Sequence, residues 1–161
     1  MTGITPFLWF NDQAEEAANY YVSIFPNSRI TKIARYPEGS PGPTGQVMTM
    51  TFELDGCEFT ALNGGPHFQL SPAFSLVVKC ENQAEVDRYW AALSADPTAE
   101  QCGWVKDKFG VSWQIVPNEM PGLLTDKDPE KAQRVMQAML KMKKIDIEEL
   151  KRAHAGATVT T

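Results

Sequence analysis

The sequence predicts an α+β fold of two repeated modules, in each of which a strand, a helix and further strands follow one another. Two amphipathic helices open with matching segments, residues 12–15 (Asp-Gln-Ala-Glu) and 82–85 (Asn-Gln-Ala-Glu), and each follows a short apolar strand. Two later strands, residues 56–62 and 110–116, begin with glycine. In each of them the third residue after the glycine is aromatic and the fourth is polar. Two such modules side by side predict an eight-stranded, curved, mixed sheet with helices outside and a concave cavity inside.

The first module is predicted over about residues 3–64. Asn11 and Asp12 are suited to cap its helix, and the acidic residues that follow complement the helix dipole. Asp55-Gly56 is typical of a two-residue hairpin turn. The predicted elements, in order, are a strand at 5–10, a helix that ends at Pro26, a strand at 29–36, a mobile Gly/Pro-rich loop at 37–45, and strands at 46–54 and 57–62.

The second module is predicted over about residues 70–118, with a strand at 73–80, a helix that begins at Asn82 and a hairpin at 101–117. In the hairpin turn, Asp107 is expected to bond back to the backbone, and Gly110 tolerates a positive φ. Side chains alternate along the strand after this turn. One side is expected to carry Val111, Trp113 and Ile115, and the other Ser112, Gln114 and Val116.

A C-terminal helical extension is predicted over about residues 128–154, after a loop at 117–128. Asp128 is a suitable cap for a helix with Pro129 in its first turn. Apolar side chains recur along this helix at Ala132, Val135, Met136, Met139 and Leu140. Asp146 is expected to cap a last short helix through Leu150, and the tail from Ala155 is expected to fray.

The composition is that of a soluble globular protein. The chain has 161 residues, 43% of them hydrophobic and 22% charged, which suits one domain over residues 1–161. A net charge of −5 lacks the basic face that a nucleic-acid-binding protein needs, so no nucleic-acid partner is expected. We find no signal peptide and no apolar run long enough to span a membrane, and we expect a cytoplasmic location without a membrane partner.

The three cysteines, Cys57, Cys80 and Cys102, are an odd number without a CxxC pair. We expect reduced, mostly buried thiols. A nucleophilic role for Cys102 needs a base or a positive field, and no histidine lies near it in the sequence. A buried structural role for Cys102 is the favoured interpretation.

Four segments give the sequence a family resemblance: Thr5-Pro6-Phe7-Leu8-Trp9-Phe10, Ala14-Glu15-Glu16-Ala17-Ala18, Gln101-Cys102-Gly103-Trp104 with Asp107, and Phe109-Gly110-Val111-Ser112-Trp113-Gln114. With them, the chain resembles the vicinal-oxygen-chelate superfamily of glyoxalase I, extradiol dioxygenases, fosfomycin-resistance enzymes and bleomycin-binding proteins. It is most similar to the PhnB-like group, whose members often carry the label 3-demethylubiquinone-9 3-methyltransferase. The resemblance covers about residues 3–154 and implies paired βαβββ modules in a single glyoxalase-like domain, and a homodimer.

The resemblance also implies where a metal would lie. Metal-dependent members of the superfamily place one His or Glu on the first and on the last strand of each module. The corresponding positions here are Thr5, Thr60, Ala73 and Gln114. Divalent transition metals need His, Cys or carboxylate ligands, usually three or more, so we expect no metal and no other cofactor. Glu58 and Glu53 are the best substitute ligands, and a solvated strand edge is their alternative interpretation.

Aromatic and small polar residues are expected to line the cavity instead. Phe7 and Trp9 share a face with Thr5, and Trp104 can stack on a flat ligand, although aromatic residues at strand spacing are more often part of the core. We assign no catalytic residue. The predicted ligand-binding residues are Thr5, Phe7, Trp9, Thr60, Leu62, Ser75, Trp104, Ser112 and Gln114.

These observations favour a protein that binds a small organic molecule, or a metal-independent enzyme, of the glyoxalase and bleomycin-resistance kind. One alternative is a divergent metal-dependent lyase or isomerase that uses Gln114 with Glu58 or His67. Another is the methyltransferase named by the family label. Binding of S-adenosylmethionine usually needs a Gly-rich loop after the first strand, and here residues 11–13 contain no glycine.

Overall fold

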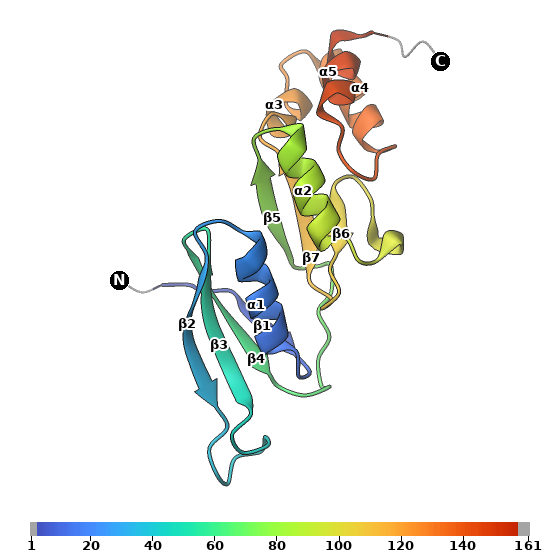
Figure 1. Ribbon diagram of the computed structural model, residues 1–161. Helices are drawn as coiled ribbons and strands as arrows, with labels where there is room; N and C mark the ends of the chain where they lie inside the picture. The colour runs from blue at the N-terminus through green and yellow to red at the C-terminus, as the bar shows by residue number, and fades with distance from the viewer. Residues whose placement is uncertain (1–2, 158–161) are drawn as a thin grey trace. The chain divides into compact units, whose positions relative to one another are not determined.

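A computed structural model describes residues 3–157 of the chain. They fall into two compact units, with the boundary between Ser71 and Pro72. We call these the N-terminal unit and the C-terminal unit, and each is described by itself (Figure 1). Within the described residues, no helix is both long and apolar enough to cross a membrane.

The N-terminal unit is a four-stranded mixed sheet in the order β1-β4-β3-β2, with one helix. β1 pairs with β4 in parallel, and the β2–β3 and β3–β4 pairs are antiparallel. Asp55 and Gly56 both have positive φ, 47° and 79°, so the predicted hairpin turn between β3 and β4 is confirmed. The elements are β1 (Phe7–Phe10), α1 (Ala14–Ile24), β2 (Arg29–Arg35), β3 (Val47–Leu54) and β4 (Cys57–Asn63).

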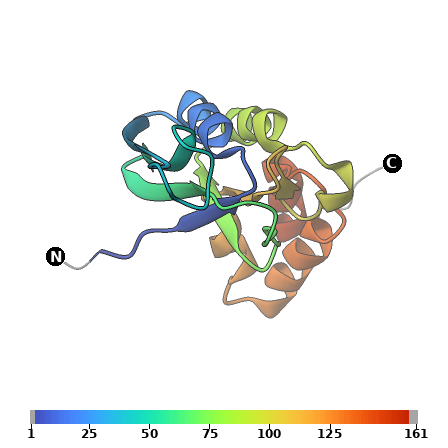
Figure 2. The same cartoon turned by 90° about the horizontal axis from the view of Figure 1, so that it is seen from below.

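Helix α1 covers one side of this sheet (Figure 2). It buries Ala14, Ala17, Ala18 and Tyr21, and the Tyr21 ring lies 6.3 Å from that of Phe52 on β3. The predicted capping of α1 by Asn11 or Asp12 is wrong. The side chain of Asn63, at the end of β4, accepts the Ala14 N–H at 2.7 Å. A residue far away in the sequence therefore satisfies a backbone donor at the start of α1.

The C-terminal unit contains a three-stranded mixed sheet in the order β5-β7-β6. β5 (Ser75–Cys80) and β7 (Ser112–Pro117) are parallel, whereas β6 (Trp104–Lys106) and β7 are antiparallel. Helix α2 (Gln83–Leu93) packs on this sheet, and its predicted cap is confirmed because the Asn82 side chain accepts the Glu85 N–H at 3.0 Å. The α+β fold with two repeated modules is thus confirmed.

The prediction of eight strands is wrong, because the described residues form seven, four in one unit and three in the other. After α2 the chain enters a short 3₁₀ helix, η1 (Pro97–Ala99), and then only an isolated bridge between Gln101 and Trp104. Pro97 has no N–H to donate to a ladder, and the Asp96 carboxylate accepts the Thr98 N–H at 3.0 Å. Both features favour a turn here, so the second module has three strands and not the four that the repeat implied.

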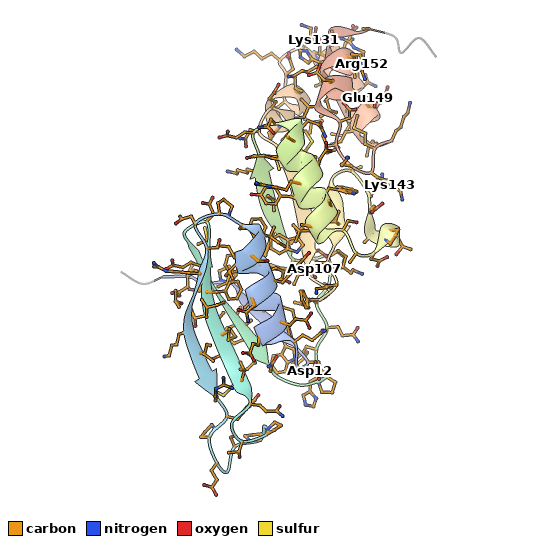
Figure 3. All side chains as sticks on the ribbon, in the orientation of Figure 1. Asp12, Asp107, Lys131, Lys143, Glu149 and Arg152 are labelled. Atoms are coloured by element: carbon orange, nitrogen blue, oxygen red, sulfur yellow. The ribbon has the colours of Figure 1, made fainter. Side chains whose placement is uncertain are left out.

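The turn between β6 and β7 is held by Asp107, which is only 4% exposed (Figure 3). Its Oδ1 accepts the N–H groups of Phe109 at 2.8 Å and Val111 at 3.0 Å, and its Oδ2 accepts the indole N–H of Trp113 at 2.8 Å. A buried carboxylate needs such donors to offset its lost hydration. The predicted turn bond is confirmed, and Asp107 also fixes the orientation of Trp113.

The C-terminal extension contains three helices, α3 (Met120–Leu124), α4 (Pro129–Met139) and α5 (Ile147–Ala155). The short α3 replaces part of the loop predicted at 117–128, and α5 extends beyond Leu150. Asp128 and Asp146 cap α4 and α5 as predicted, through the N–H groups of Glu130 and Glu149. The extension has a core of its own, formed by Met120, Val135, Met142, Ile145 and Leu150.

The extension is bonded to the sheet by the segment before β6. Cys102 N–H donates to the Met142 carbonyl at 2.9 Å, and Gly103 N–H to that of Lys143 at 2.7 Å. The Gly103 carbonyl accepts the Ile115 N–H from β7 at 2.8 Å. Gly103 has φ +86°, and a Cβ there would lie 2.9 Å from the Ile115 carbonyl oxygen, so only glycine fits.

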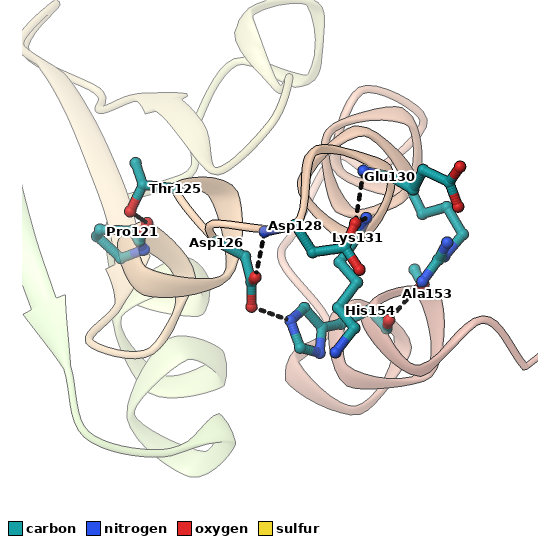
Figure 4. A network of polar contacts seen from close by, with 9 residues as sticks. Pro121, Thr125, Asp126, Asp128, Glu130, Lys131, Ala153 and His154 are labelled. Atoms are coloured by element: carbon teal, nitrogen blue, oxygen red, sulfur yellow. Dashed lines mark hydrogen bonds and ion pairs between the residues drawn. The ribbon is translucent and has the colours of Figure 1, made fainter.

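Helix α5 is also held by a polar pair outside this core (Figure 4). Asp126 Oδ2 lies 2.7 Å from His154 Nε2, and Asp126 Oδ1 accepts the Asp128 N–H at 2.8 Å. The Asp128 N–H, followed by the His154 ring, lowers the pKa of the Asp126 carboxyl below its usual 3.8. The ionised form of Asp126 is therefore favoured by folding.

We expect Asp107→Ala to lower the free energy of unfolding by about 3 kcal/mol or more, because it leaves three buried N–H donors without their acceptor. Urea unfolding followed by tryptophan fluorescence measures the change. Glu81→Ala, at an exposed position of the same unit, is the control and should change stability by less than about 0.5 kcal/mol. A loss below about 1 kcal/mol for Asp107→Ala would contradict the role given to this carboxylate.

Asp126→Asn should lower the Tm by an amount that depends on pH. A carboxyl whose folded pKa is depressed stabilises the fold above its unfolded pKa, and this stabilisation disappears as the pH falls through the folded value. The Tm difference between wild type and variant should therefore shrink between about pH 5 and about pH 2.5 in calorimetric scans. Glu130→Gln, at an exposed position of α4, is the control. A difference that stays constant over this range argues against a role for the Asp126 charge.

Candidate functional site

Strand register places the predicted ligand-binding residues on the side of each sheet that its helix does not cover. We call this side the open face of a sheet. In the N-terminal unit, Phe7 lies opposite Thr60, and Trp9 opposite Leu62. Leu8, between Phe7 and Trp9, is 1% exposed, whereas Phe7 is 58% exposed. The alternation of side chains along β1 thus separates the core from the open face.

Part of this N-terminal set is already engaged in local contacts. The Trp9 indole N–H donates to the Gly65 carbonyl at 2.9 Å, and its ring meets the Phe68 ring edge-on at 5.0 Å. Thr5 lies two residues before β1, and its hydroxyl donates to the Glu58 carboxylate at 3.3 Å. These five predicted residues, Thr5, Phe7, Trp9, Thr60 and Leu62, form one group on the N-terminal unit. Their part in ligand binding stays a prediction.

The other four predicted residues come together on the C-terminal unit. Ser75 lies opposite Ser112, and Trp104 opposite Gln114, on the open face of this sheet. The Gln114 side-chain amide donates to the Ser75 hydroxyl at 2.9 Å. The alternation predicted for β7 is reflected in burial, because Trp113 and Ile115 are 2% and 0% exposed while Gln114 is half-buried. This unit therefore carries a compact polar and aromatic group.

A cavity of about 330 Å³ adjoins this group. Its walls are Pro72, Thr98, Ala99, Gln101, Trp104, Val105, Lys106 and Ser112. The sequence prediction included Trp104 and Ser112 but missed Lys106, which lies two residues after Trp104 and therefore on the same face of β6. It also missed Thr98 and Gln101, because they belong to the irregular segment between α2 and β6.

Two hydrogen-bond donors of this cavity have no acceptor within residues 3–157. The Ser112 side chain is polar yet its residue is only 4% exposed, and the structure gives its hydroxyl no hydrogen-bond partner among the described residues. The half-buried Trp104 indole N–H is in the same situation. No fully buried side-chain nitrogen or oxygen of residues 3–157 lacks a hydrogen-bond partner, so the Ser112 hydroxyl keeps some accessible surface. The cavity wall therefore offers the hydrogen-bond donors of Ser112 and Trp104.

The residues at the four metal positions do not fit a transition metal. Thr5 and Ala73 lie just before β1 and β5 rather than on them, so the predicted first strands begin about two residues too early. Gln114 offers a neutral amide that is already bonded to Ser75. Across residues 3–157, no group of three or more His, Cys, Asp or Glu side chains could hold a metal ion. Such an ion needs imidazole, thiolate or carboxylate ligands.

The expectation of mostly buried cysteines is wrong. Only Cys80 is buried, Cys57 is exposed and Cys102 is half-buried. Burial raises the pKa of the Cys80 thiol to about 11, and the nearby Glu85 adds to the shift. Cys102 has φ +49° and accepts the Gln101 side-chain N–H at 3.3 Å, so its main structural role is in the backbone link to the C-terminal extension.

Alkylation with iodoacetamide at about pH 8 should modify Cys57 first, Cys102 more slowly and Cys80 last, because the thiolate is the reactive species and must be accessible. Peptide mass spectrometry over time gives the three rates. Unfolding in guanidinium chloride is the control and should make the rates similar. Modification of Cys80 as fast as that of Cys57 in the native protein is the contrary outcome.

The chain was compared with models of protein families, with curated proteins and with solved structures. The model of a family described as 3-demethylubiquinone-9 3-methyltransferase matches residues 2–116. A PhnB protein from Bacillus cereus is 39% identical over 72% of this chain and 99% of its own, with a TM-score of 0.62. Protein PA1353 from Pseudomonas aeruginosa is 22% identical over 73% of this chain and 98% of its own, with a TM-score of 0.56. No curated protein matches.

The family match ends at residue 116, before α3, whereas the resemblance was expected to reach residue 154. The two modules are thus the matched part, and the C-terminal extension lies outside it. PA1353 is similar in fold alone at this level of identity.

Proposed function

Because the chain belongs to the family described as 3-demethylubiquinone-9 3-methyltransferase, whose relatives include a PhnB protein, we propose that it binds a small organic molecule in the manner of glyoxalase and bleomycin-resistance proteins. The ligand lies in the cavity beside Trp104 and Ser112, on the open face of the C-terminal unit. The observation that carries this proposal is the Ser112 hydroxyl, which has no hydrogen-bond partner among residues 3–157 and lies on the wall of a cavity of about 330 Å³. Cavities of this size hold small ligands in other proteins.

Binding by this site does not require a metal. The Gln114 amide and the Ser75 hydroxyl form a neutral pair on the open face, where a metal-dependent relative needs a carboxylate. A neutral pair orients a ligand through hydrogen bonds, but it holds a cation weakly. The proposal therefore includes no step that a metal performs, and it assigns no reaction.

The methyltransferase named by the family description fits this fold poorly. The usual S-adenosylmethionine site follows a parallel strand with a Gly-rich loop, in a sheet covered by helices on both faces. Here β1 leads through residues 11–13, which contain no glycine, into α1. In addition, α1 covers only one face of a mixed sheet (Figure 2). The methyltransferase hypothesis therefore has less support than the binding hypothesis.

The second alternative is a metal-dependent lyase or isomerase that uses Gln114 with Glu58 or His67. Glu58 already accepts the Thr5 hydroxyl, and its cross-strand neighbour Glu53 is paired with Arg29 at 3.0 Å. Neither interaction needs a metal, so this alternative has less support than a metal-independent site. A metal analysis of the protein separates the two.

We also propose that the protein is a homodimer in the cytoplasm. Large apolar side chains remain exposed on the open faces, among them Phe7 at 58% and Val77 at 53%. Such side chains are commonly covered in an assembly.

Native mass spectrometry of the purified protein should give the mass of two chains without a bound metal. The same protein is then screened by NMR against a library of small aromatic and polar compounds. Some of these compounds should shift the ¹H–¹⁵N resonances of residues 98–114. Gln114→Ala should lower the affinity for these ligands about three- to tenfold, because a neutral hydrogen-bonding group is removed from the open face.

The matched control is Gln133→Ala, the same change at an exposed position of α4, which should leave binding unchanged. One transition metal per chain, or a library without any compound that shifts these resonances, would overturn the proposed function. A monomeric mass would overturn the dimer alone.

A further inference from the structure

The charge in the cavity beside Trp104 is of one sign. Among its eight lining residues Lys106 is the single charged side chain, and no Asp or Glu is present. Lys106 lies directly opposite Ser112 in the antiparallel β6–β7 pair. Side chains at such positions have Cβ atoms about 5 Å apart, so the Lys106 ammonium and the Ser112 hydroxyl can reach one shared group.

Lys106 is only loosely engaged within the described residues. Its Nζ lies 3.6 Å from Asp96 Oδ2, which is longer than a hydrogen bond, and both side chains are more than one-third exposed. Asp96 is satisfied without it, because its Oδ1 accepts the Thr98 N–H at 3.0 Å and the Thr98 hydroxyl at 2.6 Å. An ion pair this long and exposed is weak, so the lysine is available to a ligand.

The remaining polar groups of the cavity divide into occupied and open ones. The Gln101 side-chain N–H groups are used by the Leu140 carbonyl at 3.0 Å and by Cys102 Sγ. The Thr98 hydroxyl is used by Asp96. The open groups are the donors of Ser112, Trp104 and Lys106 and one acceptor, the Gln101 side-chain oxygen, and Lys106 is the one among them that carries a charge. A ligand that matches them brings acceptors, and a carboxylate also brings the opposite charge.

Trp104 adds a flat apolar surface to this donor set. Its ring is half-buried and lies two residues before Lys106 on the same face of β6. Successive same-face residues on a strand are about 7 Å apart, which is the length of a bicyclic aromatic ring system with one acidic substituent. Aromatic side chains bind such rings by stacking or edge-on contact.

We propose that this cavity selects planar organic anions, with the carboxylate held between the Lys106 ammonium and the Ser112 hydroxyl and the ring against Trp104. This inference rests on the proposed function and adds the class of ligand to it. Lys106 is then the residue that determines specificity for an acid over its neutral counterpart.

The test compares 2-naphthoate with 2-naphthamide, a neutral molecule of the same shape. Titrations of the full-length protein are followed by ¹H–¹⁵N spectra, which give both affinity and location. Naphthoate should shift the resonances of Trp104, Lys106 and Ser112 and bind at least about tenfold more tightly than naphthamide, because a charge-assisted hydrogen bond is lost with the amide.

Lys106→Met should remove this preference, and Lys106→Arg should keep most of it. The matched control is Lys79→Met, which removes the same charge from an exposed position on the open face of β5, opposite Val116 and outside the cavity. That control should leave the preference intact. Ser112→Ala should lower the affinity for naphthoate more than the affinity for naphthamide.

Equal affinity for the acid and the amide in wild type would overturn the ligand class while the proposed function stands. Binding of naphthoate without shifts at Trp104, Lys106 and Ser112, or an equal loss in Lys79→Met and Lys106→Met, would overturn the assigned site. Absence of binding by both probes would also overturn this inference. The proposed function fails separately, through the library experiment.

Discussion

The C-terminal unit depends on one buried carboxylate. Asp107 holds the backbone of the β6–β7 turn and the indole of Trp113 at the same time. This fixes the strand register, because a slip of one residue would turn every side chain of a strand to the opposite face. The register then places Lys106 opposite Ser112 on the open face, so a structural interaction in the core determines which polar groups line the cavity.

Both units solve the same packing problem with one helix for each sheet. Helix α1 covers one face of the N-terminal sheet, and helix α2 covers one face of the C-terminal sheet. Because side chains alternate along a strand, small polar and aromatic side chains lie on the other face. In a protein whose sheets were packed on both faces, these positions would be apolar. The open faces are thus a consequence of the repeated strand–helix–strands plan.

The local features were predictable from the sequence, whereas the long-range ones were not. Asn82 caps its helix through a residue three positions away, so the sequence contains the whole interaction. The residues before helix α1 look equally suitable as caps. The Asn63 side chain nevertheless accepts the Ala14 N–H, because β4 ends beside the start of the helix. The bonds from Cys102 and Gly103 to the C-terminal extension likewise join segments about forty residues apart, which no local pattern indicates.

The sequence by itself determined the repeated modules and the two faces of β7, because both depend on residue type and on spacing along the chain. The lack of imidazole or carboxylate at the metal positions also came from the sequence, but those positions are ones that the family resemblance implies. Only the tertiary structure decided that the Ser112 hydroxyl, on a cavity wall, lies opposite Lys106, and that an irregular segment with Thr98 forms part of the same wall. Burial and cross-strand neighbours are properties of the folded chain, since they depend on how strands pair and on which face a helix covers.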